Sequence, residues 1–205
     1  MAILSNAVTI ADAGAFSLNL GSMVLIKTLT ASNAATASFV GGASGVVLDD
    51  TYSTYIFKFI NVHPVTNNVK WTFQSDVGTG TTYGQTITST DFISQHSEDD
   101  SATEFGYAGA NDQGQGTAFQ PIGQLVGNGG DECVSGTLHI FDPSNATFIK
   151  HFISNTNVYR QDNYSREHFT AGYFNTTTAL TRFQFKFSSG NIDSGIIKLY
   201  GIKAS

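Results

Sequence analysis

The sequence predicts an all-β protein: a two-sheet antiparallel sandwich, jelly-roll-like, with about ten strands and an N-terminal arm. Apolar and polar residues alternate with a period of two in many short stretches, as Phe183, Phe185 and Phe187 do near the end of the chain. Clusters of Gly, Ser, Thr and Asn separate these stretches, and such clusters are typical of turns. No stretch keeps the 3.6-residue period of an amphipathic helix over three turns.

The pattern of residues 181–203 predicts a terminal β-hairpin. Three Phe residues alternate with polar residues over 182–188, the turn-rich stretch SSGNIDSG follows, and Ile197 and Leu199 then alternate with Lys198 and Tyr200. One face of this hairpin is apolar, and an isolated hairpin is marginally stable in water. We therefore expect the rest of the chain to supply a second layer that covers the Phe face.

The first 22 residues alternate poorly, and we interpret them as an arm or an extra strand that docks on a neighbouring subunit. Residues 23–205 then form a single β-sandwich domain. Its first two strands are expected at 23–32 and 35–40, with a glycine-rich turn at 41–45.

Residues 52–64 give the most regular strand pattern of the first half. Both faces of this strand are mostly apolar, so we expect a central strand that is covered on each side. Pro64 ends the strand, because proline cannot donate to a β-ladder. Residues 66–68 form a turn, and residues 69–73 are predicted to return as the second strand of another hairpin.

The second half alternates between irregular and regular stretches. Residues 83–93 predict one or two short strands, and residues 95–133 predict long loops around one strand at 119–126. Residues 136–154 predict a hairpin whose turn begins with Asp142 and Pro143. A further strand is expected at 166–174.

Composition and charge exclude several classes of function. The chain has ten Lys and Arg residues and a net charge of −6, so it lacks the basic surface that a nucleic-acid-binding protein needs. No apolar run reaches the roughly 20 residues that span a bilayer, and we expect no membrane partner. The single cysteine, Cys133, excludes an intrachain disulfide and a zinc site with several cysteines. Residues 1–16 contain no Lys or Arg of a signal peptide, so we expect assembly in a reducing cytoplasm.

The five histidines are the candidate metal ligands. His139 and His151 fall on the two strands of the 136–154 hairpin, where they could be cross-strand neighbours, but a zinc site needs a further ligand from elsewhere. His96 lies beside acidic residues at 98–100, without the spacing of a calcium loop. His63 and His168 belong to no ligand motif. We expect no metal and no cofactor.

The candidate catalytic groups are carboxylates in the predicted loops. Asp49 and Asp50, Asp112, and the pair Asp131 and Glu132 could act as acid and base in glycoside hydrolysis. Acidic loop residues more often serve solubility, and Cys133 has no flanking motif of a nucleophile. We therefore expect that the protein is not an enzyme.

Several phrases of the sequence carry a resemblance to a known group of proteins. They are IKTLTASNAATASFV (26–40), VVLDDTYSTYIFKFINVHP (46–64), DQGQGTAFQPI (112–122), GTLHIFDPSNATFIKHF (136–152) and FKFSSGNIDSGIIKLYGI (185–202). Together they resemble small virion structural proteins of tailed phages that infect marine and aquatic bacteria, including cyanophages. The similarity covers residues 23–202 and includes no catalytic motif. It implies a component of the virion that is assembled in the cytoplasm of a bacterial host.

Our first hypothesis is a capsid decoration (cement) protein that stabilises the shell through arm and loop contacts. Its partners would be the major capsid protein or tail components and further copies of itself, with a trimer as one arrangement. The alternative is a tail or fibre protein with a lectin-like β-sandwich that binds a glycan of the host surface. The residues that we expect at an interface are apolar or aromatic residues of the arm and the central loops: Ile3, Leu4, Val8, Ile10, Phe16, Leu18, Phe105, Tyr107 and Phe119.

Overall fold

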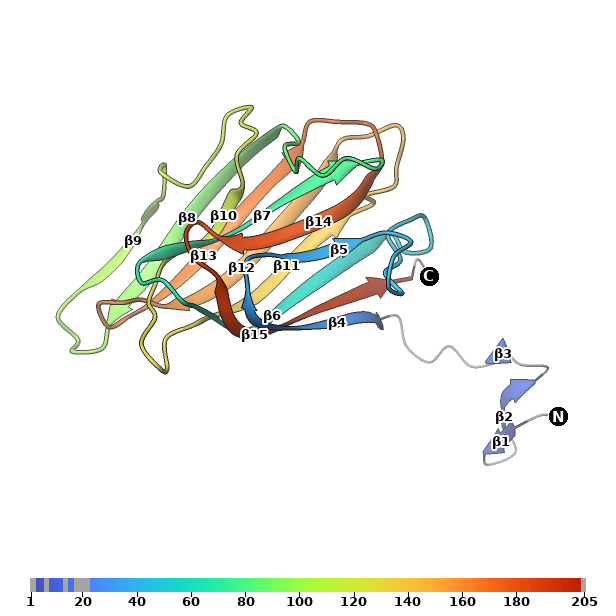
Figure 1. The fold of residues 1–205 in the computed structure, drawn as a ribbon, viewed down its shortest axis with the longest axis horizontal. Helices are drawn as coiled ribbons and strands as arrows, with labels where there is room; N and C mark the ends of the chain where they lie inside the picture. Colours follow the sequence, from blue (N-terminus) through green and yellow to red (C-terminus); the bar gives the residue numbers. More distant parts are fainter. Residues whose placement is uncertain (1–2, 6–7, 13–14, 17–22, 204–205) are drawn as a thin grey trace.

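The computed structural model describes residues 3–5, 8–12, 15–16 and 23–203, and for residues up to Phe16 it describes the strands without their side chains. These residues form fifteen β-strands, and no described residue is helical (Figure 1). The predicted all-β class is therefore confirmed.

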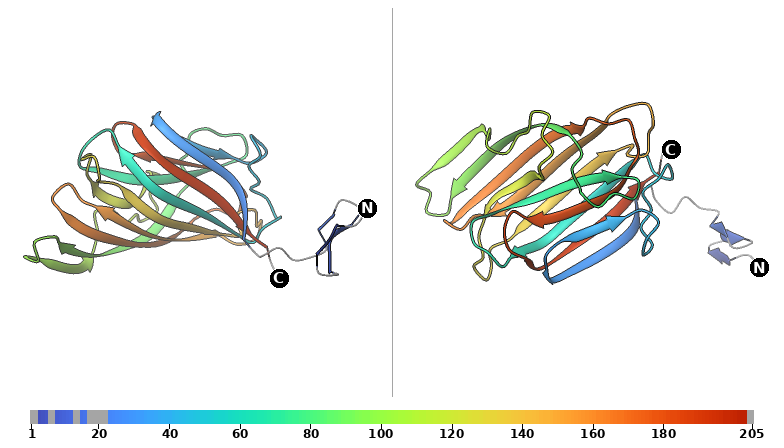
Figure 2. Two further views of the ribbon diagram at one scale, coloured as in Figure 1. Left: turned by 90° about the horizontal axis from the view of Figure 1, so that it is seen from below. Right: turned by 45° about the horizontal axis from the view of Figure 1, so that its top comes forward.

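Two antiparallel sheets build the body of the molecule, and Figure 2 shows them stacked as two layers. The larger sheet has eight strands in the order β4 (Met23–Ala34), β15 (Ile192–Ile202), β6 (Thr54–Pro64), β11 (Val134–Phe141), β12 (Lys150–Tyr159), β13 (Tyr164–Phe174), β8 (Ile87–Ser97) and β9 (Thr103–Tyr107). The smaller sheet has four strands in the order β10 (Gln120–Val126), β7 (Val69–Val77), β14 (Leu180–Phe187) and β5 (Ala37–Val40). The two-sheet sandwich predicted from the sequence is confirmed, and the chain passes repeatedly from one sheet to the other, as it does in jelly rolls.

Aromatic rings fill the space between the sheets. Phe183, Phe185 and Phe187 all point inward and are almost completely buried, as their alternation predicts. The Phe185 ring lies at the centre, with its centroid 4.9 Å from that of Phe57 and 5.9 Å from that of Trp71. Most of these pairs have the edge-to-face geometry that aromatic rings prefer.

The terminal hairpin predicted for residues 181–203 is wrong. The two strands exist, but β14 pairs with β5 and β7 in the small sheet, whereas β15 pairs with β4 and β6 in the large sheet. The apolar faces of β14 and β15 face the interior from opposite layers, so the turn between them crosses the sandwich. The same correction applies to residues 52–73, because β6 and β7 also belong to different sheets. Alternation identifies a strand and its buried face, but it does not identify the neighbour in the ladder.

Other expectations of strand position hold in part. The predicted 136–154 hairpin is confirmed, since β11 and β12 pair along their length. The strand at 119–126 is also confirmed, as β10. The strand β9 lies within the predicted loops and was not expected from the sequence; it pairs with the end of β8. The strand β6 is central as expected, but its outer face is open at Ile60, which is 37% exposed.

The strands β1 (Ile3–Ser5), β2 (Val8–Asp12) and β3 (Ala15–Phe16) form a three-stranded sheet of their own. They pair with each other and, among the described strands, with none of the two larger sheets. The function of this segment as an arm stays a prediction.

Candidate functional site

The outer face of the large sheet, which points away from the small sheet, carries an unusual row of aromatic side chains. The ladder pairs Phe169 of β13 with Phe92 of β8, and Phe92 with Tyr107 of β9. Phe105, two residues before Tyr107, lies on the same face because side chains in a strand alternate. We call Phe92, Phe105, Tyr107 and Phe169 the aromatic strip. It runs across three strands to the edge of the sheet.

The aromatic strip is partly to largely exposed, and three of its rings contact one another. Phe105 is 76% exposed and Tyr107 is 62% exposed. The Phe92 ring stacks on Phe169 with centroids 5.0 Å apart, and it contacts the Phe105 ring edge-on at 5.8 Å. Large exposed aromatic side chains that support each other are typical of surfaces that contact another molecule.

Tyr107 is held in place by the loop that follows β9. Its hydroxyl donates a hydrogen bond to Asp112, and this bond raises the pKa of the Tyr107 hydroxyl above its ordinary value. Asp112, one of the predicted candidate carboxylates, therefore orients an aromatic side chain.

Two of the predicted interface residues, Phe105 and Tyr107, are brought together in the aromatic strip. Phe119 lies elsewhere: it precedes β10 and is half-buried, and the Lys186 ammonium lies 4.0 Å from its ring centroid. For Ile3, Leu4, Val8, Ile10 and Phe16 the side chains lie outside the described part of the chain, and Leu18 lies outside it altogether.

Sequence reasoning missed Phe92 and Phe169 as surface residues. Both belong to stretches with a period of two, and the buried residues on either side of them indicate that they face outward. For β13 these neighbours are His168 and Thr170, which are polar, so the pattern alone gave no reason to place Phe169 outside. Only the register between β8 and β13 brings the two rings together.

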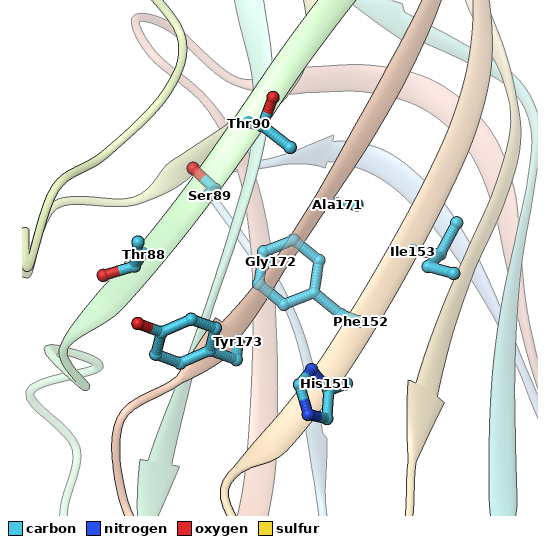
Figure 3. A pocket seen from close by; sticks show the side chains of 9 residues that line it. All are labelled: Thr88, Ser89, Thr90, His151, Phe152, Ile153, Ala171, Gly172 and Tyr173. Atoms are coloured by element: carbon cyan, nitrogen blue, oxygen red, sulfur yellow. The ribbon is translucent and has the colours of Figure 1, made fainter.

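A shallow hollow lies beside the aromatic strip on the same face (Figure 3). Ala171 forms its floor, because in the ladder it lies between Thr90 and Ile153, one row away from Phe169. Tyr173 and His151 form its other side, with their rings 6.1 Å apart. The hollow has a volume of about 560 Å³.

Gly172 allows the chain to lie closely against its neighbours beneath the hollow. A Cβ atom there would approach the Phe152 ring to 2.8 Å and the Thr88 carbonyl oxygen to 2.5 Å. The Phe152 ring, which belongs to the core, therefore lies directly under the strand at this position. Any side chain at residue 172 would disturb both the core and the ladder.

The histidines do not form the pair that the sequence suggested. His139 is paired with Ile153 rather than with His151, so the two histidines are offset along the sheet. His96 lies 3.0 Å from Asp100 on an exposed turn. Among the residues that the structure describes, no group of three His, Cys, Asp or Glu side chains is placed to hold a metal ion.

Two of the remaining candidate carboxylates, Asp49 and Glu132, stabilise turns. Asp49 accepts a hydrogen bond from the Thr51 amide, and Glu132 accepts one from the Gly129 amide. Asp131, Glu132 and Cys133 line a second hollow, of about 400 Å³. Burial raises the pKa of the Cys133 thiol, which makes it a poorer nucleophile.

Asp91 and His168 form a buried pair that the sequence analysis did not anticipate. His168 Nδ1 lies 3.2 Å from Asp91 Oδ2, and Asp91 also accepts hydrogen bonds from Thr170 and Asn111. Neither Asp91 nor His168 has exposed surface, so a substrate cannot reach them. These contacts tie the loop that contains Asn111 to β8 and β13.

Comparisons with protein-family models, with curated proteins and with solved structures found no match to this chain. Within the described ranges no helix is long and apolar enough to cross a membrane.

Proposed function

We propose that this protein is a structural component of a phage virion, a capsid decoration protein that attaches to the shell. The observation that carries the proposal is the aromatic strip, which lies on the outer face of the large sheet and reaches the edge strand β9. The resemblance of residues 23–202 to virion proteins of tailed phages supports the same class.

The chemistry of the aromatic strip suits attachment to another protein. Removing one exposed Phe side chain from water contributes about 1.5–3 kcal/mol. Aromatic residues also lose little conformational entropy when they are immobilised, because they have only two rotatable side-chain bonds. Small polar residues such as Ser94 and Thr90 surround the rings, and a polar rim of this kind is typical of protein interfaces.

The charge of the molecule favours a particular kind of partner. With a net charge of −6 the protein repels strongly acidic surfaces, so we expect the contacted patch of the shell to be apolar at its centre and neutral or basic at its rim. A major capsid protein with such a patch repeated by symmetry would bind many copies at once.

The test is attachment of variants to shells that lack this protein. We expect the double variant Phe92→Ser with Phe105→Ser to lose attachment, because it removes two of the four rings of the aromatic strip. The matched control is Phe148→Ser, since Phe148 is 68% exposed but lies in the turn between β11 and β12, away from the strip. Undiminished attachment of the double variant, measured by sedimentation with shells, would refute the proposal.

The hollow over Ala171 supports a second candidate function, a tail or fibre protein that binds a glycan. Tyr173 offers a ring on which a sugar can stack, and His151 and Thr88 offer polar groups beside it. A glycan array with the native protein and with Tyr173→Ala tests this candidate. Selective binding that the variant loses would favour the appendage function, and absence of binding to every glycan would count against it.

A further inference from the structure

The geometry points to a specific partner for strand β9: the same strand of a second copy of this chain. The two copies of β9 would pair antiparallel around a two-fold axis through Phe105. Figures 1 and 2 show β9 and β4 at opposite edges of the large sheet. Edge strands present unpaired backbone groups and are templates for pairing with another chain.

The backbone of β9 has groups free to form such a ladder. Ser97 donates its amide to the carbonyl of Ala102, and Ala108 donates its amide to the carbonyl of Asp91. These two bonds lie just before and just after β9, and they show which residues direct their backbone groups toward β8. In an antiparallel pair every second residue exchanges backbone hydrogen bonds with the residue opposite it on the partner strand. The residues between them direct their amide and carbonyl groups away from that strand.

This alternation shows, for each residue of β9, whether its backbone amide and carbonyl groups point toward β8 or toward the open edge. Glu104 and Gly106 direct their backbone groups toward β8, in step with the bonds on either side. The three residues that direct their amide and carbonyl groups to the open edge are therefore Thr103, Phe105 and Tyr107. Their side chains all lie on the outer face, where the aromatic strip is.

A two-fold axis through Phe105 pairs the whole strand. Phe105 then lies opposite Phe105 of the second copy, and Thr103 lies opposite Tyr107. Each residue whose amide and carbonyl groups point to the open edge therefore lies opposite another such residue. Glu104, the single charged residue of β9, lies opposite Gly106. An axis through Glu104 would instead place two carboxylates directly opposite each other, which is destabilising.

The pairing would also join the two aromatic strips into one. The rings of Phe169, Phe92, Tyr107 and Phe105 in one copy would continue into those of the other, across a sheet made of two eight-stranded sheets. The inferred pairing rests on the proposed function, since the joined strip would be the surface that meets the shell. It closes the association at two copies, as a two-fold contact does.

The other edge strand, β4, gives the competing arrangement. Met23 and Leu25 of β4 are also exposed, so β9 of one copy could pair with β4 of the next. A contact between two different edges does not close and would produce chains of increasing length. The size of the assembly in solution therefore separates the two arrangements.

The sharpest experiment is disulfide formation between two copies. In a Cys133→Ser background, Phe105→Cys would place two cysteines directly opposite, with Cα atoms about 5.5 Å apart, within the range of a disulfide. Glu104→Cys is the matched control. Its two cysteines would be offset along the ladder by two residues, with Cα atoms roughly 8 Å apart, which is too far.

We expect mild oxidation to give a covalent dimer with Phe105→Cys and little or none with Glu104→Cys. Equal cross-linking of both variants, or none with Phe105→Cys, would overturn the inferred register.

Light scattering of the native protein gives an independent measurement. We expect a dimer for the native chain and for Phe148→Lys, and a monomer with unchanged melting temperature for Phe105→Lys, because two lysines would then face each other. A monomeric native protein, a dimeric Phe105→Lys or a ladder of longer assemblies would overturn the pairing. Failure of the pairing would leave attachment of the aromatic strip to shells standing, since that attachment is measured separately.

Discussion

Phe185 has no exposed surface and touches rings from both sheets. Truncating such a side chain removes its burial and leaves a cavity that the neighbours fill only in part. We expect Phe185→Ala to lower the free energy of unfolding by about 3–5 kcal/mol. Urea unfolding measures the loss, with Phe148→Ala as the exposed control. A loss as small as that of the control would show that the ring is not part of the core.

Asp76, near the end of β7, holds the loop that follows it. Its carboxylate accepts hydrogen bonds from the amides of Val77, Thr82 and Tyr83 and from the side chain of Gln85. Burial alone raises the pKa of this group, but the hydrogen bonds outweigh it and the pKa lies below the ordinary 3.8. The charged form is therefore favoured in the folded state.

The pKa of Asp76 predicts how stability depends on pH. A lowered pKa in the folded state contributes stability above the unfolded pKa, and this contribution is lost as the pH falls through the folded value. We expect Asp76→Asn to cost about 1–3 kcal/mol at pH 7. The difference between native protein and variant should shrink below about pH 4. Urea unfolding at both pH values checks this, and an equal difference at both would contradict it.

At the scale of single residues the sequence showed which side chains are buried wherever the alternation was regular. Phe183 and Phe185 are examples. It did not show that Phe92 and Phe169 share an exposed face, because this depends on the register between strands that lie far apart in the chain. Phe105 and Tyr107 could therefore be predicted as surface residues from the sequence, whereas Phe92 and Phe169 could be placed beside them only from the fold.

Individual strands could be located from alternation and turn residues, whereas their partners could not. The 136–154 hairpin has a connection at residues 142–149 that begins with Asp142 and Pro143, and its strands pair as predicted. The connections after β6 and after β14 also contain turn residues, yet they cross between the sheets. In both cases each of the two strands has an apolar face. When the two strands lie in opposite sheets, their apolar faces meet across the core and both are buried. Local patterns do not distinguish these two outcomes.

Strand β15 contains a bulge that depends on Gly195. The register against β6 shifts on both sides of Ser194, and Gly195 has a φ of +134°. A Cβ atom there would lie 2.7 Å from the Val62 Cα. We expect Gly195→Ala to cost roughly 1–3 kcal/mol, because the backbone conformation is strained for any other residue.

Thermal unfolding checks this prediction, with Gly84→Ala as the matched control. Gly84 has open space around its Cβ position. Equal melting temperatures for the two variants would show that the bulge tolerates a side chain.

For the molecule as a whole, the path of the chain predicts cooperative unfolding. Strands that follow each other along the chain repeatedly lie in different sheets, so neither sheet is a continuous segment that could fold alone. Both sheets also share the aromatic core. We expect calorimetry to show one transition for residues 23–203, with equal calorimetric and van't Hoff enthalpies. Two separate transitions would contradict this.

We propose that the protein serves a virion through contacts of its large sheet, and an electron cryo-microscopy map of the particle that contains this chain would show those contacts. We expect density for the sandwich on the shell, with Phe92 and Phe105 turned toward a neighbouring protein. Particles without this density, or with the aromatic strip facing solvent, would contradict it.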